Sequence, residues 1–241
     1  MLKTAVIYAG PSKIDRKPII GVVTGLNGGS RNPKTGKMSQ LWILRSDINP
    51  VEAVKRGEDY SICGTCSHRG TGNADRICYV NLMGPNSIFE TYREGKYPAI
   101  DPRELSRLPK RLPMRLGAYG EPAALPVPIL RAIAKNVPRW TGYTHLWKRC
   151  HPSYRRWLMA SVDNEQEQSQ AQSEGWRTFR VREHGQPVLS GEIDCPASEK
   201  QGHRLQCTDC YACNGCGPNN TSQRVSITIE VHGKSAGKFS S

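Results

Sequence analysis

The sequence has no long hydrophobic run. No window approaches the ~18 uninterrupted apolar residues that a membrane-spanning helix needs, so no membrane span is expected. The first residues, MLKTAVIYAGPSK, contain too short an apolar stretch for a secretory signal peptide. We therefore expect a cytoplasmic protein, in which cysteine thiols stay reduced.

Acidic residues are scarce relative to basic ones. The 241 residues include 21 Asp and Glu against 34 Lys and Arg, which gives a formal net charge of +13. Such an excess is typical of proteins that bind a polyanion, of which nucleic acid is the commonest. A solvated basic surface on an ordinary enzyme is the alternative. DNA is therefore the expected partner.

The Gly-x-Gly-x-x-Gly fingerprint of dinucleotide-binding folds is absent after every expected strand. Strand-like runs instead alternate with helix-like segments, which predicts an α/β fold with βαβ units and a parallel sheet. The number of repeats favours a (β/α) barrel, either regular or incomplete and distorted, over a doubly wound sheet. We expect a mobile N-terminal segment over residues 1–40, apart from the short strand PIIGVVTG, and a single barrel-like domain over residues 41–241. The expected strands are LWILRSD (41–47), ICYVNLM (77–83), MRLGAYG (114–120), WTGYTHLW (140–147), LMASVDN (158–164), WRTFRVR (176–182) and SGEID (190–194), and the expected helices are NSIFETYREG, AALPVPILRAIAKNV and NEQEQSQAQSEG.

Polar residues that follow the expected strands are candidates for a site, because barrel enzymes carry their working residues at the carboxyl ends of the strands. Asp163, Asp194 and Asp47 each end a strand-like run, and we predict them as catalytic candidates. An N-cap role explains Asp163 and Asp47 as well, and hydrogen bonding to loop amides explains Asp194. The expected substrate-binding residues are Tyr119, Gly120, Glu121, His145 and Trp147.

Eight of the nine cysteines fall into two clusters, within residues 63–78 and 195–216. Cys-x-x-Cys steps place two thiolates on one metal ion, and zinc is the expected metal. Three consecutive steps also resemble the bacterial ferredoxin run, so an iron–sulfur cluster is the alternative. Structural use of a metal is more common than catalytic use. The predicted ligands are Cys63, Cys66 and Cys78 in the first loop and Cys195, Cys207, Cys210, Cys213 and Cys216 in the second.

Basic residues gather in two runs, PRELSRLPKRLPMR (102–115) and KRCHPSYRRW (148–157). Cations interleaved with aromatic residues suit DNA phosphates and unstacked bases. A solvated face accounts for the charges equally well. The predicted nucleic-acid contacts are Arg107, Lys110, Arg111, Lys148, Arg149, Arg155 and Arg156.

Several short motifs together resemble a phage-encoded family related to tRNA-guanine transglycosylases, which inserts 7-deazaguanine bases into DNA. These motifs are YGEP after a strand, TGYTHLW, ASVDN and the closing CP…CTDCYACNG, scattered over residues 41–216. That family has a (β/α) barrel, a zinc loop late in the chain and a nucleophile in an Asp-Cys step, which Asp194-Cys195 resembles. Three features depart from it: the zinc-loop spacing differs, the Gly-Gly-Phe-Gln step is absent, and the first cysteine cluster has no counterpart.

The resemblance implies a DNA-guanine transglycosylase that exchanges guanine for a preQ0-type 7-deazaguanine base through a covalent aspartate intermediate. A carboxylate would capture the sugar C1′, and a second carboxyl group would manage the proton on the base. If the chain is phage-encoded, the expected compartment is the cytoplasm of the host cell. Two alternatives remain open: an iron–sulfur redox enzyme of radical type, and a zinc-bearing nucleic-acid-binding protein without catalysis.

Overall fold

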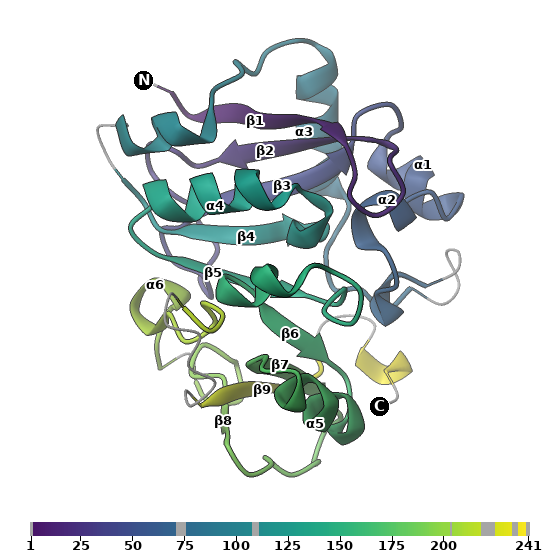
Figure 1. The fold of residues 1–241 in the computed structure, drawn as a ribbon, viewed down its shortest axis with the longest axis vertical. Helices are drawn as coiled ribbons and strands as arrows, with labels where there is room; N and C mark the ends of the chain where they lie inside the picture. Colours follow the sequence, from purple (N-terminus) through teal and green to yellow (C-terminus); the bar gives the residue numbers. More distant parts are fainter. Residues whose placement is uncertain are drawn as a thin grey trace.

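Nine strands in the described part of the chain form a single sheet (Figure 1). We analysed a computed structural model that describes residues 2–70, 76–107, 111–202, 204–217, 225–232 and 236–239. The spatial order of the strands is β1-β2-β3-β4-β5-β6-β7-β9-β8. Their bounds are β1 Thr4–Pro11, β2 Pro18–Thr24, β3 Ser39–Arg45, β4 Met114–Tyr119, β5 Trp140–Thr144, β6 Met159–Val162, β7 Thr178–Arg182, β8 Glu192–Asp194 and β9 Ser226–Glu230.

Most of the sheet is parallel, as the alternating pattern predicts. The ladders β1–β2 and β2–β3 are antiparallel, and every ladder from β3 onward is parallel. The α/β class is therefore confirmed. Within the described residues no ladder joins β1 to β8, so the sheet is open.

Two expectations about the strands are wrong. Residues 4–11 form a strand instead of part of a mobile segment, because their apolar side chains face the core and their backbone pairs with β2. The expected short strand PIIGVVTG is confirmed as β2, which also pairs with β3. The expected strand at 77–83 is irregular chain that leads into α3 (Met83–Arg93), because Arg76 donates hydrogen bonds to the carbonyls of Cys78 and Val80. Strand β9 follows the second cysteine loop and inserts between β7 and β8.

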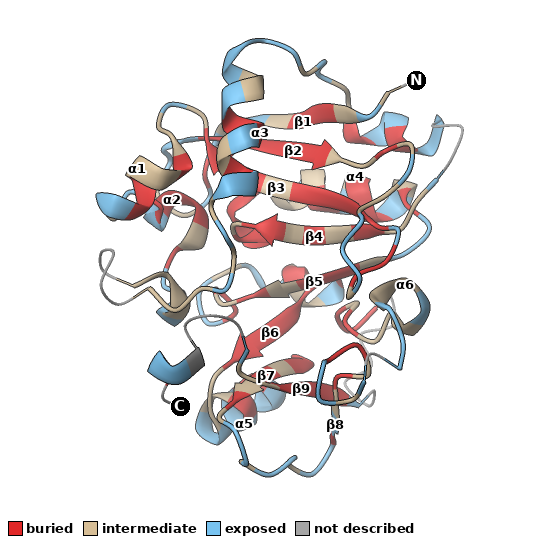
Figure 2. Ribbon diagram, turned by 180° about the vertical axis from the view of Figure 1, so that it is seen from behind, coloured by how far each residue is buried: buried red, intermediate tan, exposed pale blue. Residues whose placement is uncertain are grey.

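Helices cover both faces of the sheet. Figures 1 and 2 show α4 (Val127–Asn136) on one face and α3 on the other. Both α4 and α5 (Glu165–Ser173) lie within the segments expected to be helical. The remaining helices are short: α1 Pro50–Lys55, α2 Tyr60–Cys63, α6 Cys207–Cys210, and the 3-10 turns η1 Ser67–Arg69, η2 Pro102–Arg107, η3 Pro122–Ala124, η4 Pro152–Arg156 and η5 Ala236–Lys238.

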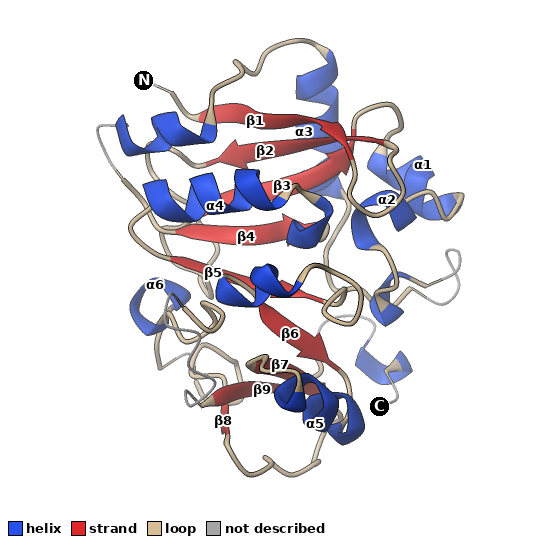
Figure 3. Ribbon diagram, viewed as in Figure 1, coloured by secondary structure: helices blue, strands red, loops and turns tan. Residues whose placement is uncertain are grey.

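Because neighbouring strands from β3 onward are parallel, their carboxyl ends lie along one side of the sheet and their amino ends along the opposite side. The strands β3 to β6 end at the same side, which is at the right in Figure 3, where α1, α2 and η1 also lie. We call this side the carboxyl edge and the opposite side the amino edge. Most residues of the strands are buried (Figure 2). The buried apolar side chains form a large cluster around β1 to β6 and a smaller cluster, which includes Met159, Cys195, Cys213, Ile227 and Ile229.

Candidate active site and cysteine clusters

Asp163 lies at the carboxyl edge, directly after β6. Its Oδ2 accepts a hydrogen bond from the Ser67 hydroxyl at 2.5 Å, and its Oδ1 lies 2.9 Å from Nε2 of His68. Burial opposes ionisation of Asp163, but the hydrogen bonds from His68 and Ser67 and the nearby His145 outweigh it and lower the pKa of this carboxyl group. Asp163 is therefore an ionised carboxylate at neutral pH, held from two sides.

The same carboxylate lines a cavity of about 410 Å³, a volume within the usual range for small-molecule sites. Trp147 is also among the lining residues; it is almost fully buried and its ring is fixed by a hydrogen bond from Nε1 to the carbonyl of Ser161 at 3.1 Å. Lys148 lies over that ring, 4.9 Å from its centroid, and pairs with Glu167 at 2.8 Å. The lining residues are Thr65, Ser67, His145, Trp147, Lys148, Arg149, Ser161, Asp163, Asn164 and Glu167.

His145 reaches the cavity from the end of β5. Glu121 accepts hydrogen bonds from the His145 backbone N–H at 2.8 Å and from the Thr144 hydroxyl at 2.6 Å, and its Oε1 lies 3.4 Å from Nδ1 of His145. Burial opposes protonation of His145, but the Cys66 thiol and Glu121 outweigh it and raise its pKa well above the usual value. The other ring nitrogen, Nε2, is buried and has no hydrogen-bond partner among the described residues.

The predicted substrate-binding residues divide into two groups. His145 and Trp147 line the cavity, whereas Tyr119, Gly120 and Glu121 are not among its lining residues. Gly120 has a φ of +77°, and a Cβ there would lie 2.6 Å from the carbonyl oxygen of Ile43. The requirement for glycine at this position therefore comes from close packing against β3. Glu121 is buried and positions His145.

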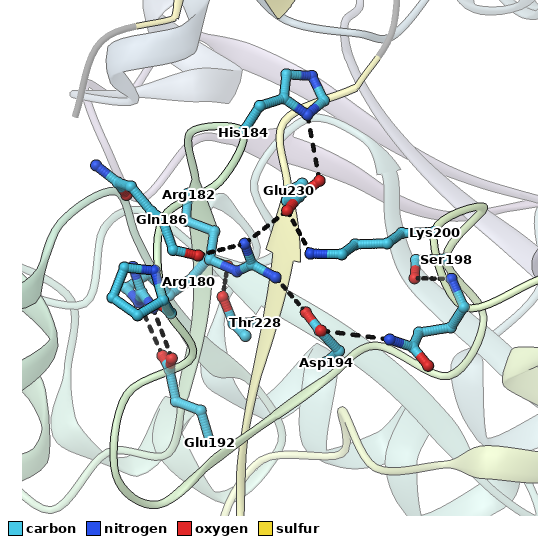
Figure 4. A network of polar contacts seen from close by, with 12 residues as sticks. Arg180, Arg182, His184, Gln186, Glu192, Asp194, Ser198, Lys200, Thr228 and Glu230 are labelled. Atoms are coloured by element: carbon cyan, nitrogen blue, oxygen red, sulfur yellow. Dashed lines mark hydrogen bonds and ion pairs between the residues drawn. The ribbon is translucent and has the colours of Figure 1, made fainter.

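Asp47 and Asp194, the other predicted catalytic acids, are engaged elsewhere. Asp47 forms a two-point ion pair with Arg45 at 2.8 Å, and the hydrogen bond from Arg45 lowers the pKa of Asp47. Asp194 pairs at 2.5 Å with Arg182, which is almost fully buried (Figure 4). Neither acid lines the Asp163 cavity.

The predicted DNA contacts lie at different edges of the sheet. Lys148 and Arg149 line the cavity at the carboxyl edge, and both are exposed. Arg107 and Arg111 precede β4 and are exposed at the amino edge. Arg155 and Arg156 lie in η4, ahead of β6, where their carbonyls accept hydrogen bonds from the backbone of the second cysteine loop, and Lys110 lies outside the described residues.

The second cysteine loop packs against the smaller part of the core. Cys195, Cys207 and Cys213 are close together there, and burial is the largest cause that raises the pKa of each thiol. Cys210 lies at the end of α6, which begins at Cys207. Cys216 stands apart, because its thiol donates a hydrogen bond to the carbonyl of Gly175 at 3.4 Å.

Neither cysteine cluster is drawn together tightly. Tetrahedral zinc with Zn–S bonds of ~2.3 Å holds its sulfurs roughly 4 Å apart. Within the described residues, the possible ligand atoms that all lie within 4.8 Å of one another belong to His68, His145 and Asp163, and no three thiols meet that limit. The predicted cysteine-rich metal loops therefore remain a prediction.

Three residues at Asp163 were not predicted: Ser67, His68 and Glu167. Glu167 is three residues after the helix N-cap Asn164, whose side chain accepts its backbone N–H, and its Oε2 accepts the backbone N–H of Asp163 at 3.1 Å. The Asn-x-x-Glu spacing is the signal for such a capping arrangement. No comparable signal links Ser67 and His68 to Asp163.

Comparison of the chain with models of known families, with curated proteins and with solved structures gives no match. Among the described residues, no helix combines the length and the apolar character that a membrane crossing requires.

Proposed function

We propose that the protein exchanges a guanine base in DNA for a 7-deazaguanine base of the preQ0 type, with Asp163 as the nucleophile. The observation that supports this best is one ionised carboxylate in a cavity that is also lined by one aromatic residue and two cations. Trp147 suits apolar contact with an extruded base, and Lys148 and Arg149 suit the flanking phosphates. The 7-deazaguanine substrate itself rests on the resemblance of the sequence motifs.

The chemistry requires one nucleophile and one group that handles a proton. The Asp163 carboxylate attacks C1′ of the deoxyribose, the bond from C1′ to N9 of guanine breaks, and the departing base keeps the electron pair and takes up a proton. N9 of the incoming base then loses its proton and attacks C1′, which releases the carboxylate. We assign both proton transfers to Glu167, the second carboxylate that lines the cavity.

The remaining acids and the second cysteine loop have supporting roles in this proposal. Asp194 holds Arg182 and so fixes the start of the loop that carries Cys195. Cys195, Cys207, Cys210 and Cys213 form a four-thiol donor set, which suits a structural zinc ion once the thiols are drawn together. The open sheet would then be an incomplete form of the (β/α) barrel.

Incubation of the purified protein with DNA and a radiolabelled preQ0-type base tests the proposal. We expect label in the DNA and an equal amount of guanine released, because one base leaves for each one inserted. Single-stranded and double-stranded DNA are tested separately, because extrusion from a duplex costs a few kcal/mol. Absence of both incorporation and guanine release from either DNA would contradict the proposed function.

DNA binding should depend on the cations at the carboxyl edge. The double substitution Lys148→Ala and Arg149→Ala removes two phosphate contacts and should reduce the slope of log affinity against log salt by about 2. The matched control is Arg107→Ala with Arg111→Ala, which removes the same charge from the amino edge and should leave the slope nearly unchanged. Fluorescence anisotropy over a salt series measures both, and the reverse ranking would place the DNA at the amino edge.

A further inference from the structure

His145 carries a buried ring nitrogen that nothing in the proposed base exchange uses. In the part of the chain that the structure describes, its Nε2 has no hydrogen-bond partner, which is unusual for a buried polar atom. The opposite nitrogen, Nδ1, lies 3.4 Å from the Glu121 carboxylate. Histidines that bind metals commonly have this arrangement, in which a carboxylate orients one nitrogen and leaves the other for the metal.

The first cysteine cluster lies beside the end of β5, which His145 follows directly. The Cys63–Cys66 turn is closed by a hydrogen bond from the Cys66 N–H to the Cys63 carbonyl at 3.2 Å. The turn packs tightly on the residue after His145, because a Cβ on Gly64 would lie 2.4 Å from Cδ2 of Leu146. The backbone N–H of Glu121 bonds to the carbonyl of Ile62 at 2.6 Å, which joins the same turn to the end of β4.

Cys78 is brought to this place by the backbone of η1. Its N–H donates to the carbonyl of His68 at 2.8 Å, and the N–H of Ile77 donates to the same carbonyl at 3.1 Å. Cys66 lies near enough to interact electrostatically with both Cys63 and Cys78, so the three thiols face the same region. The Tyr119 hydroxyl is buried and has no partner within the described residues, so it is a second unsatisfied polar atom near these thiols.

We propose that Cys63, Cys66, Cys78 and His145 bind one zinc ion. Three thiolates and one imidazole are a common closed, structural donor set for zinc. The competing set of His68, His145 and Asp163 is less suited, because Nε2 of His68 and Oδ1 of Asp163 already satisfy each other at 2.9 Å. The ion would bring the thiols closer together and hold η1 in place. Ser67 and His68 of η1 would then stay in contact with Asp163. This inference does not depend on the base exchange.

The zinc content of the purified full-length chain, measured by mass spectrometry of the elements, tests the proposal. His145→Gln and Cys66→Ser should each contain one zinc ion per chain fewer than the unchanged protein. Cys150→Ser and His151→Gln, which alter a thiol and an imidazole outside the set, should keep the full amount. Cobalt substituted for zinc should show thiolate-to-cobalt absorption that changes in His145→Gln.

His145→Cys keeps the test decisive if His145→Gln fails to fold, because a fourth thiolate should restore the zinc content. Unchanged zinc in both His145→Gln and Cys66→Ser would overturn the proposal. Loss of zinc in His68→Gln but not in Cys66→Ser would overturn it in favour of the histidine–aspartate set. Iron with acid-labile sulfide in place of zinc would overturn it as well. Asp163→Asn should abolish base exchange and retain zinc, so the two proposals fail separately.

Discussion

Asp163→Asn should lower the rate of base exchange by at least about a thousand-fold, which corresponds to about 4 kcal/mol of transition-state stabilisation. The substitution is nearly isosteric, and the amide oxygen can still accept the Ser67 hydrogen bond. An amide cannot attack C1′ well, however, so the covalent intermediate should not form. Incorporation of a labelled base measures the rate, and a protein–DNA adduct that survives denaturation reports the intermediate.

The two other predicted acids provide the controls for this result. Asp47→Asn changes a carboxylate at the end of β3 that is paired with Arg45 and lies outside the cavity, so exchange and adduct should both persist. Asp194→Asn should likewise retain the adduct, although it weakens the pair with Arg182. An adduct that is lost in Asp194→Asn and retained in Asp163→Asn would place the nucleophile at Asp194 and refute our assignment.

The parallel part of the sheet could be predicted from the sequence, because its apolar runs alternate with helical patterns. Of the two antiparallel strands, β2 was predicted as the short strand PIIGVVTG, whereas β1 and the pairing of β2 with β3 were not. The Gly-, Lys- and Asn-rich stretch after β2 has the composition of a mobile loop, and it obscured the pairing of β2 with β3. The strand predicted at 77–83 was wrong because its Ile, Tyr and Val residues favour a strand by composition. In the structure, the Arg76 guanidinium donates hydrogen bonds to two of its backbone carbonyls.

The candidate site was predictable only where it lies on the strands. Asp163, His145 and Trp147 follow β5 and β6, so the strand-end rule finds them. His68 is 95 positions away from Asp163, and the two meet because the loop after α2 folds back over the carboxyl edge. A contact of this kind depends on the topology, which the local pattern of residues does not encode.

Asp194 precedes the cysteine loop because it anchors a buried cation. Arg182 is 1% exposed and forms ion pairs with Asp194 at 2.5 Å and with Glu230 at 2.8 Å (Figure 4). Glu230 also binds Lys200 and His184, and the hydrogen bond from Lys200 is the largest cause that lowers the pKa of Glu230 to about 2. The guanidinium therefore joins β7, β8 and β9 at the point where the cysteine loop begins.

Arg182→Met should lower the free energy of unfolding by about 3–5 kcal/mol, the usual cost of removing one partner from a buried ion pair. Methionine fills much of the volume but leaves the Asp194 and Glu230 carboxylates without the guanidinium. Urea unfolding followed by circular dichroism measures the change, with an unchanged m-value indicating that the native and denatured states are otherwise alike.

The matched control is Arg93→Met, the same substitution at an exposed position on α3. Within the described residues, the Arg93 guanidinium makes only a long 3.5 Å contact with the carbonyl of Ser46. This variant should stay within about 0.5 kcal/mol of the unchanged protein. The double variant Arg182→Met with Asp194→Asn should recover part of the lost stability, because it removes one of the two carboxylate charges that Arg182→Met leaves unpaired. If Arg182→Met were no less stable than Arg93→Met, the Arg182 network would contribute nothing to holding the three strands, and another contact would have to fix the start of the cysteine loop.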